Sequence, residues 1–307
     1  MRIELLLSAG LALAAQPPAD PTGAEGMRFQ PADGSVLVKR FNIGHELNLD
    51  SVGQVFDGGP FQAERLTSTI STWFTLTAED RYMELSDGRG RRLRRTYLDL
   101  GGGGKLNMRP EGFPQQPEQD AVLVSPLRNR SIDFTWIDAE QDWSRCWSTE
   151  HFDEEWLAGI RGDMDLLALL PPGEVAEGQG WELPIGAVRA LLAPGGNHLI
   201  TPRTPNVFSR TIEVGVGGDF SEILGPDLLG RLTATFTGVR EQDGKRLAVV
   251  ELSIEGLQSF ADRTALYRTA MPEEERREQT RLVTVLLEYR LDARGELLWD
   301  LDAGHAH

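Results

Sequence analysis

Hydrophobic and polar residues alternate along much of the chain, and this two-residue period is typical of strands that bury one face. In the clearest run, residues 64–85, one parity carries Thr67, Thr69, Ser71, Trp73 and Thr75, and the other carries Leu66, Ile70, Phe74 and Leu76. The sequence DGRG at 87–90 then predicts a turn into a second strand over 91–100. This pattern favours a half-buried antiparallel hairpin.

The same rhythm returns over residues 230–256. Leu232, Ala234 and Phe236 alternate with threonines, QDGK at 242–245 supplies a turn, and residues 247–253 form the return strand. The similarity of the two hairpins predicts two related halves. Further short strands are expected at 35–41, 45–52, 121–127, 131–138, 142–150 and 206–218, and at 281–292 and 295–304, with a turn at 293–295.

The period changes to that of a helix between His151 and Leu170. Apolar residues recur there every three or four positions, acidic residues crowd the first turn, and two prolines at 171 and 172 end the pattern. Gly162 is a point at which this helix divides into two pieces. A glycine-rich turn over 173–180 then leads to Trp181, and a second short helix is expected over 185–192.

These elements predict an α+β fold that is mainly antiparallel β. Long curved hairpins and a few short helices would form a half-open barrel or a sandwich-like pair of related halves. The expected boundaries are a signal peptide at 1–15, a flexible linker at 16–34, an N-terminal β-rich half with a helix at 35–170, and a C-terminal β-rich half at 171–307.

The N-terminus has the pattern of an export signal. Arg2 precedes an apolar run over 5–15, and small residues stand before Gln16. This run is too short for a membrane anchor, and no later segment approaches the roughly 20 apolar residues of a transmembrane helix. We therefore expect a soluble protein, periplasmic or secreted, with no integral membrane segment after signal removal.

The charge and cysteine content of the chain limit the classes of partner and of chemistry that we expect. The formal net charge of −16 disfavours nucleic acid, whose backbone is also negative. Cys146 is the only cysteine, which excludes an intrachain disulfide. His151 stands five residues later and permits a Cys-His nucleophile, but we favour a small buried residue among aromatics. No cofactor is expected.

Several other patterns suggest chemistry, and each has a simpler structural interpretation. The arginines at 89, 91, 92, 94 and 95 could bind an anion, but a solvated strand face paired with acidic residues is favoured. GGGGK at 101–105 lacks the spacing of a phosphate-binding loop and is interpreted as a flexible loop. Five of seven tryptophans lie between 136 and 181, where core filling is favoured over ligand stacking. His305 and His307 are interpreted as a solvated terminus and no metal site is assigned.

The order of the segments resembles a known group of proteins. The sequence DLLALLPPGEVAEGQGWELP at 165–184 and the closing GELLWDLDAGH at 295–305 are similar to uncharacterised exported bacterial β-rich proteins that share an LLP-Gly-Trp corner and an ELLWDL strand. The resemblance covers most of residues 35–305. It implies export and a β-rich fold, and it carries no catalytic residues.

No local signature of a hydrolase, a metalloprotease or a dinucleotide-binding enzyme is present, so we assign no catalytic, cofactor-binding or metal-binding residues. The favoured function is a non-catalytic envelope or secreted protein that binds an apolar small molecule or an envelope protein on a curved sheet. Its ligand-binding residues are unknown, although a cavity lined by Trp73, Phe74 and Phe236 would support a carrier. The alternative is a secreted hydrolase with a sugar or peptide cleft built from tryptophans and carboxylates at 133–165.

Overall fold

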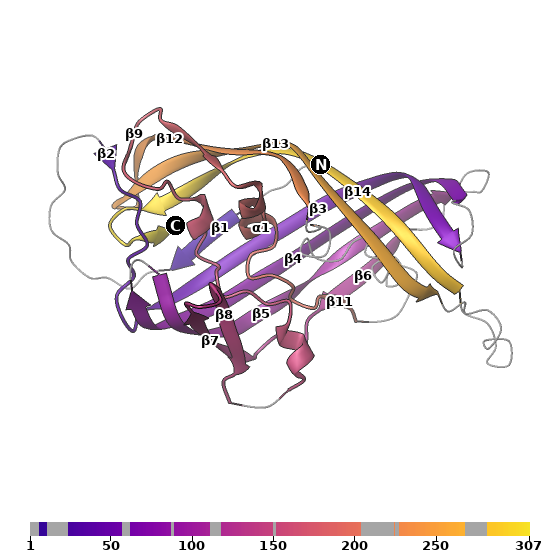
Figure 1. Ribbon diagram of the computed structural model, residues 1–307, viewed down its shortest axis with the longest axis horizontal. Helices are drawn as coiled ribbons and strands as arrows, with labels where there is room; N and C mark the ends of the chain where they lie inside the picture. Colours follow the sequence, from indigo (N-terminus) through magenta and orange to yellow (C-terminus); the bar gives the residue numbers. More distant parts are fainter. Residues whose placement is uncertain are drawn as a thin grey trace.

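The computed structural model describes residues 6–10, 24–56, 62–86, 89–110, 118–149, 152–203, 224, 227–267 and 281–307. Antiparallel strands dominate these ranges, and the helical elements are short (Figure 1). This confirms the mainly antiparallel β class predicted from the alternation.

Most strands belong to one large sheet. Its order is β10 (Gly180–Leu183), β12 (Leu228–Gln242), β13 (Lys245–Tyr267), β14 (Arg281–Asp300), β3 (Val36–Phe56), β4 (Gln62–Ser86), β5 (Arg89–Pro110), β6 (Gln119–Val124) and β11 (Thr201–Pro202). The strands β7 (Ser131–Ile137) and β8 (Asp142–Trp147) extend it beside β5, and β1 (Leu6–Gly10) and β15 (His305–Ala306) pair with β3 and β14. A second, two-stranded sheet joins β2 (Ala24–Glu25) to β9 (Val175–Ala176).

The two hairpins expected from the alternation are present. In β4, Phe74 and Leu76 are buried whereas Trp73 is exposed, as their opposite parities predict. The β12–β13 turn consists of Asp243 and Gly244, both with positive φ, between the paired residues 242 and 245. Such a two-residue turn matches the twist of the strands that it joins.

Two predicted loops are strands instead. The turn expected at 293–295 is wrong, because these residues pair in register with 252–254 inside β14. The flexible loop expected for GGGGK is also wrong, because residues 101–105 pair with β4 on one side and with β6 on the other. Pairing on both sides supplies hydrogen bonds that offset the weak strand preference of glycine.

The helix expected over 151–170 is wrong as a continuous element. It is replaced by two 3-10 turns, η1 (Glu154–Leu157) and η2 (Leu167–Leu169), which flank an irregular stretch. Leu166 has a φ of 59°, a left-handed conformation that interrupts a helix. The second helix is present as η3 (Ile185–Ala187) followed by α1 (Val188–Leu192).

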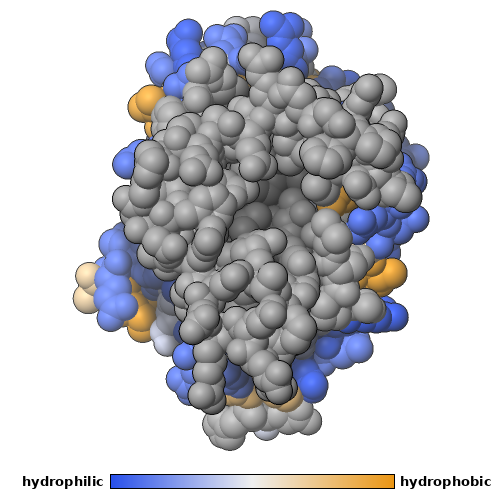
Figure 2. Space-filling view, turned by 90° about the vertical axis from the view of Figure 1, so that its right-hand side faces the viewer, coloured by the Kyte–Doolittle hydropathy of each residue, from blue (hydrophilic) through white to orange (hydrophobic). Residues whose placement is uncertain are grey.

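The segment between β8 and β12 lies against the concave side of the curved sheet, where α1 is enclosed between β12 and the strands β3 and β4 (Figure 1). One core cluster joins side chains of this segment to both β-rich portions, and it also includes Met27 and Phe29 of the predicted linker. Packed structure therefore begins before residue 35. At the end of the molecule shown in Figure 2, the described residues in view are mainly hydrophilic, with scattered hydrophobic ones.

Candidate functional site: a buried charged network beside an interrupted sheet

Three neighbouring strands each place one charged residue on the apolar face of the sheet. Lys39 lies on β3, Asp80 on β4 and Arg95 on β5, and their side chains are 8% exposed or less. Their neighbours of the same parity are apolar or aromatic: Leu37, Phe41, Leu76, Tyr82, Leu93 and Tyr97. Charges in such surroundings are stable only when they are paired.

The central pair is Asp80 with Arg95, and both side chains are fully buried. Arg95 donates from Nε to Oδ1 and from Nη2 to Oδ2 of Asp80, both at 2.7 Å. This bidentate geometry is the strongest form of an arginine–carboxylate pair. Lys39 donates a third charge-assisted bond to Oδ2 of Asp80, also at 2.7 Å.

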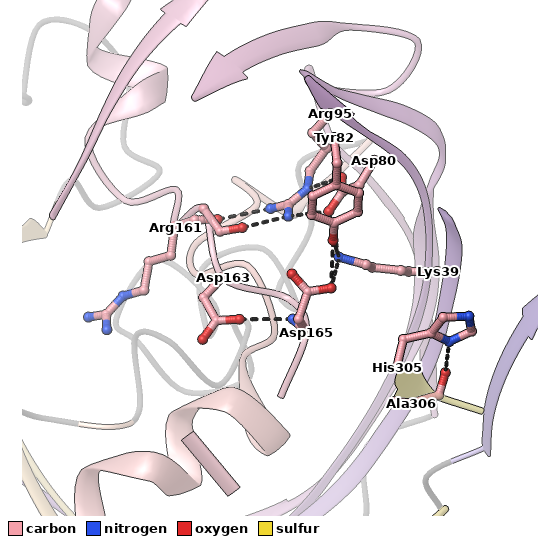
Figure 3. A network of polar contacts seen from close by, with 10 residues as sticks. Lys39, Asp80, Tyr82, Arg95, Arg161, Asp163, Asp165, His305 and Ala306 are labelled. Atoms are coloured by element: carbon pink, nitrogen blue, oxygen red, sulfur yellow. Dashed lines mark hydrogen bonds and ion pairs between the residues drawn. The ribbon is translucent and has the colours of Figure 1, made fainter. Parts of the chain in front are cut away.

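Lys39 links this pair to a carboxylate outside the sheet (Figure 3). Its Nζ atom lies 2.6 Å from Oδ1 of Asp165 and donates to the Tyr82 hydroxyl at 2.8 Å. The Tyr82 hydroxyl in turn donates to Oδ1 of Asp165 at 2.6 Å. The ammonium group therefore has three oxygen partners, as many as it has protons.

The network holds the irregular stretch between η1 and η2 against the sheet. Arg95 donates to the carbonyl oxygens of Arg161 at 2.9 Å and Gly162 at 2.7 Å. Position 162 requires a glycine, because an added Cβ would lie 2.5 Å from the Trp143 ring. The Asp163 side chain then accepts a bond from the backbone N–H of Asp165, which fixes the turn that presents the Asp165 carboxylate.

The environment shifts the protonation equilibria of this network. Burial alone would raise the pKa of Asp80, but Arg95 and Lys39 outweigh it and hold that pKa below its usual value. Burial and the nearby carboxylates raise the pKa of Tyr82 well above its usual value. Burial and the Asp165 carboxylate raise the pKa of Asp163 above its usual value.

This arrangement favours anchoring over catalysis. The Lys39 Nζ atom is engaged by oxygens of Asp80, Asp165 and Tyr82, so it is not free to attack a substrate. The adjacent pocket, which touches Lys39 and Asp165, has a volume of about 30 Å³. That volume is close to one water molecule and far below the several hundred Å³ of a small-molecule site.

The sheet is interrupted beside this network. Among the residues that the structure describes, β14 pairs with β3 only at residues 54–56, where Val283 lies opposite Phe56. At the other end of β3, residues 38–42 pair with β1 in antiparallel register, so that Leu7 lies opposite Phe41. The pocket lies at this place, between β3 and residues 305–307. Strand β1 thus pairs with a part of β3 that does not pair with β14.

The arginine run is split between the two faces of β5. Arg94 forms two hydrogen bonds with Asp133 on the more exposed face, and Arg91, which shares the parity of Arg95 but lies near the start of β5, pairs with the exposed Asp138. These contacts fit the predicted solvated face. Arg95 departs from that prediction, because strand alternation turns it into the core.

The predicted burial of Cys146 is wrong. Cys146 is exposed because it shares its parity in β8 with Ser144, whereas Trp147 has the opposite parity and is buried. His151 lies outside the described residues. His305 is buried in β15, and Nδ1 of His307 lies 3.3 Å from Lys245 Nζ, so the predicted solvated terminus is also wrong.

The aromatic side chains of the tryptophan-rich region pack against one another. Trp147 packs edge-on against Phe152 and Trp156, and Trp136 packs against Trp143. Trp181 is half-buried and donates to the Leu169 carbonyl oxygen at 3.3 Å. These contacts are typical of core and boundary packing.

The cavity proposed for a carrier is not formed by its three named residues. Phe74 and Phe236 are buried in the core cluster, whereas Trp73 lies on the opposite face of β4 and is 46% exposed. A hollow of about 480 Å³ across β12, β13 and β14 is lined by polar residues such as Thr233, Glu251 and Arg294. Its lining does not suit an apolar ligand.

Several carboxylates in the region 133–165 of the predicted hydrolase cleft have protein partners. Asp133 pairs with Arg94, Asp142 with Arg145, and Asp165 with Lys39. Within the described ranges, no group of three or more His, Cys, Asp or Glu side chains is placed to hold a metal ion. No helix in the part of the chain that the structure describes is long and apolar enough to cross a membrane.

Comparisons with protein-family models, with curated proteins and with solved structures gave no match. The function is therefore inferred from the residues and their geometry.

Proposed function

We propose that the chain is an exported, non-catalytic binding protein that accepts an extended segment of a protein partner at the edge of β3. The observation that carries this proposal is the pairing of β1 with residues 38–42, at the opposite end of β3 from residues 54–56, which pair with β14. An exposed strand edge offers unpaired N–H and C=O groups to an added strand.

Removal of the signal peptide during export would uncover this edge of β3. Strand β1 lies inside the apolar run of the predicted signal peptide at 1–15, so signal removal would withdraw the strand that covers the edge. The N-terminal pattern and the resemblance to exported bacterial proteins both support export. A partner strand would then take the position that β1 holds before the signal peptide is removed.

The surroundings indicate which segment fits. The inward side chains of β3 at this edge include Phe41 and Lys39, and Lys39 is held by its ion pair with Asp165. The pocket beside them is also lined by Met164 and Leu166. A segment with apolar residues at alternate positions suits this lining, as in β1, where Leu7 and Ala9 lie opposite Phe41 and Lys39. The cavity of about 30 Å³ favours such a strand over a lipid-sized molecule.

Amide hydrogen exchange tests this function. The chain is expressed in a bacterium, and the exported form is compared with the full-length chain. We expect the exported form to begin at Gln16 by mass spectrometry and to exchange faster at residues 38–42. A peptide with the sequence of residues 4–12 should restore slow exchange there, whereas the same peptide carrying Ser8→Pro should not, because proline cannot complete the ladder.

Two results would contradict the proposal. If the exported form keeps residues 1–15, export does not open the edge. If residues 38–42 exchange slowly without residues 1–15, the edge has another cover and accepts no partner.

A further inference from the structure

A second surface, on the outer face of the sheet, has the features of a saccharide site. It centres on Trp73 of β4, which is a large aromatic residue exposed on a sheet face, at 46% of its surface. Its neighbours across the strands are Gly44 on β3, Gly103 on β5 and, beyond Gly103, Val122 on β6. The ring therefore lies in a row that is almost free of other side chains.

The indole lies flat across the neighbouring strand. A Cβ added to Gly103 would come within 2.6 Å of the ring atom Cζ2 and 2.9 Å of Cε2. The ring thus covers the glycine backbone with one face. Covering a strand glycine in this way stabilises the sheet. It also holds the other face of the ring toward solvent in a fixed orientation.

Polar side chains border this row on both sides. Two residues toward the C-terminus of β4, the Thr75 hydroxyl donates to Asn42 Oδ1 at 3.1 Å. Two residues toward its N-terminus, the Ser71 hydroxyl lies 3.5 Å from Glu46 Oε2. Lys105, opposite Ser71, binds Glu118 at 2.8 Å. Each border lies about 7 Å from the ring along the strand, a spacing set by two strand residues.

We propose that this surface, the Trp73 platform, binds a saccharide chain. A sugar ring has an apolar C–H face that stacks on an aromatic ring and hydroxyl groups that exchange hydrogen bonds with amides, carboxylates and hydroxyls. The platform offers both, with Asn42, Thr75, Ser71, Glu46 and Lys105 at its borders. Gly103 leaves room for the indole itself, and Gly44 on its other side carries no side chain that would stand beside the ring.

The polar borders decide against an apolar occupant. A lipid or a hydrophobic protein surface would be forced to bury the charged groups of Glu46 and Lys105 without water. Beyond Trp73, the platform row contains only one other large exposed apolar residue, Val122. Two such residues do not make the contiguous patch of several hundred Å² that marks a hydrophobic interface.

Isothermal titration calorimetry with cellohexaose and with chitohexaose tests this inference on the full-length chain. We expect saturable binding of at least one of them. Trp73→Ala should weaken it at least about tenfold, whereas Trp73→Phe should keep most of the affinity because a flat ring remains. Gly103→Ala should also weaken binding, because its methyl group displaces the indole.

Trp136→Ala serves as the matched control, since Trp136 is a partly exposed tryptophan on another strand and should leave the affinity unchanged. A circular dichroism spectrum of the Trp73→Ala variant that matches that of the wild type at the assay temperature establishes that the fold is intact. The inference is overturned if neither oligosaccharide binds, if Trp73→Ala binds as the wild type does, or if Trp136→Ala loses as much affinity as Trp73→Ala.

Discussion

Replacing Asp80 by Asn tests whether the buried network holds the fold together. The substitution keeps the shape of the side chain but removes the negative charge that faces Arg95 and Lys39. Asp80 receives three charge-assisted hydrogen bonds, all at 2.7 Å, and neither it nor Arg95 has exposed surface. Removing one partner of a buried pair typically costs about 3–5 kcal/mol, because the other charge stays buried without compensation.

We therefore expect Asp80→Asn to lower the free energy of unfolding by about 4 kcal/mol, a large fraction of the 5–15 kcal/mol typical of folded proteins. Urea unfolding followed by tryptophan fluorescence measures the change. The matched control is Arg94→Met, which breaks the neighbouring pair with Asp133 on the exposed side of the same strand. Its side chains are 41% and 24% exposed, so the loss should stay below about 1 kcal/mol.

A double-mutant cycle separates the pair from its surroundings. Asp80→Leu combined with Arg95→Met should cost at least about 2 kcal/mol less than the sum of the single changes, since neither charge is then left alone. The reasoning is refuted if Asp80→Asn costs no more than Arg94→Met, or if the two single changes simply add.

Three further predictions concern other buried groups. Burial lowers the pKa of His198 to about 4, so as pH falls below about 6.5 the unfolded chain takes up this proton before the folded chain does. The free energy of unfolding should therefore drop by about 3 kcal/mol between pH 6.5 and 4. His198→Gln should reduce this drop, as measured by urea unfolding at several pH values. Because the pKa of Asp163 is raised in the folded chain, the unfolded chain loses this proton first as pH rises above the usual pKa of 3.8. Asp163→Asn should therefore raise the free energy of unfolding at pH 7 and lose this advantage below pH 3.8. A variant that is less stable than the wild type at pH 7 contradicts the assignment. Trp181→Ala should lower the free energy of unfolding by about 2 kcal/mol, less than for a fully buried tryptophan, and an unchanged urea midpoint would mean that the Trp181 ring contributes little to packing.

Much of the β architecture was predictable because its signal is local. Alternation over 64–85 and the QDGK turn at 242–245 specify which face is buried and where the chain reverses. The GGGGK strand was missed because a glycine-rich segment becomes a strand when neighbours pair with it on both sides, and those neighbours lie elsewhere in the sequence. The strand through 293–295 was missed because its turn-like residues pair with β13, about 40 residues earlier in the chain.

The buried network was missed for a related reason. Arg95 was grouped with the four other arginines nearby, although its parity matches that of Leu93 and Tyr97. The signal was available in the alternation, since Lys39 and Asp80 also interrupt apolar parities on their strands. Their pairing, however, depends on strand register and on a turn that brings Asp165 from another part of the chain, and neither can be obtained from one sequence.

The pairing of β14 with β3 joins portions of the chain more than 200 residues apart, since Val283 lies opposite Phe56. Contacts between residues so distant in sequence give a high contact order, and loop closure of that length slows folding. The sheet cannot be completed until β14 has been synthesised, so the nascent chain remains incompletely folded for longer than a protein built from local contacts. Under the proposed export, this delay would extend the time during which the chain can cross a membrane before it folds.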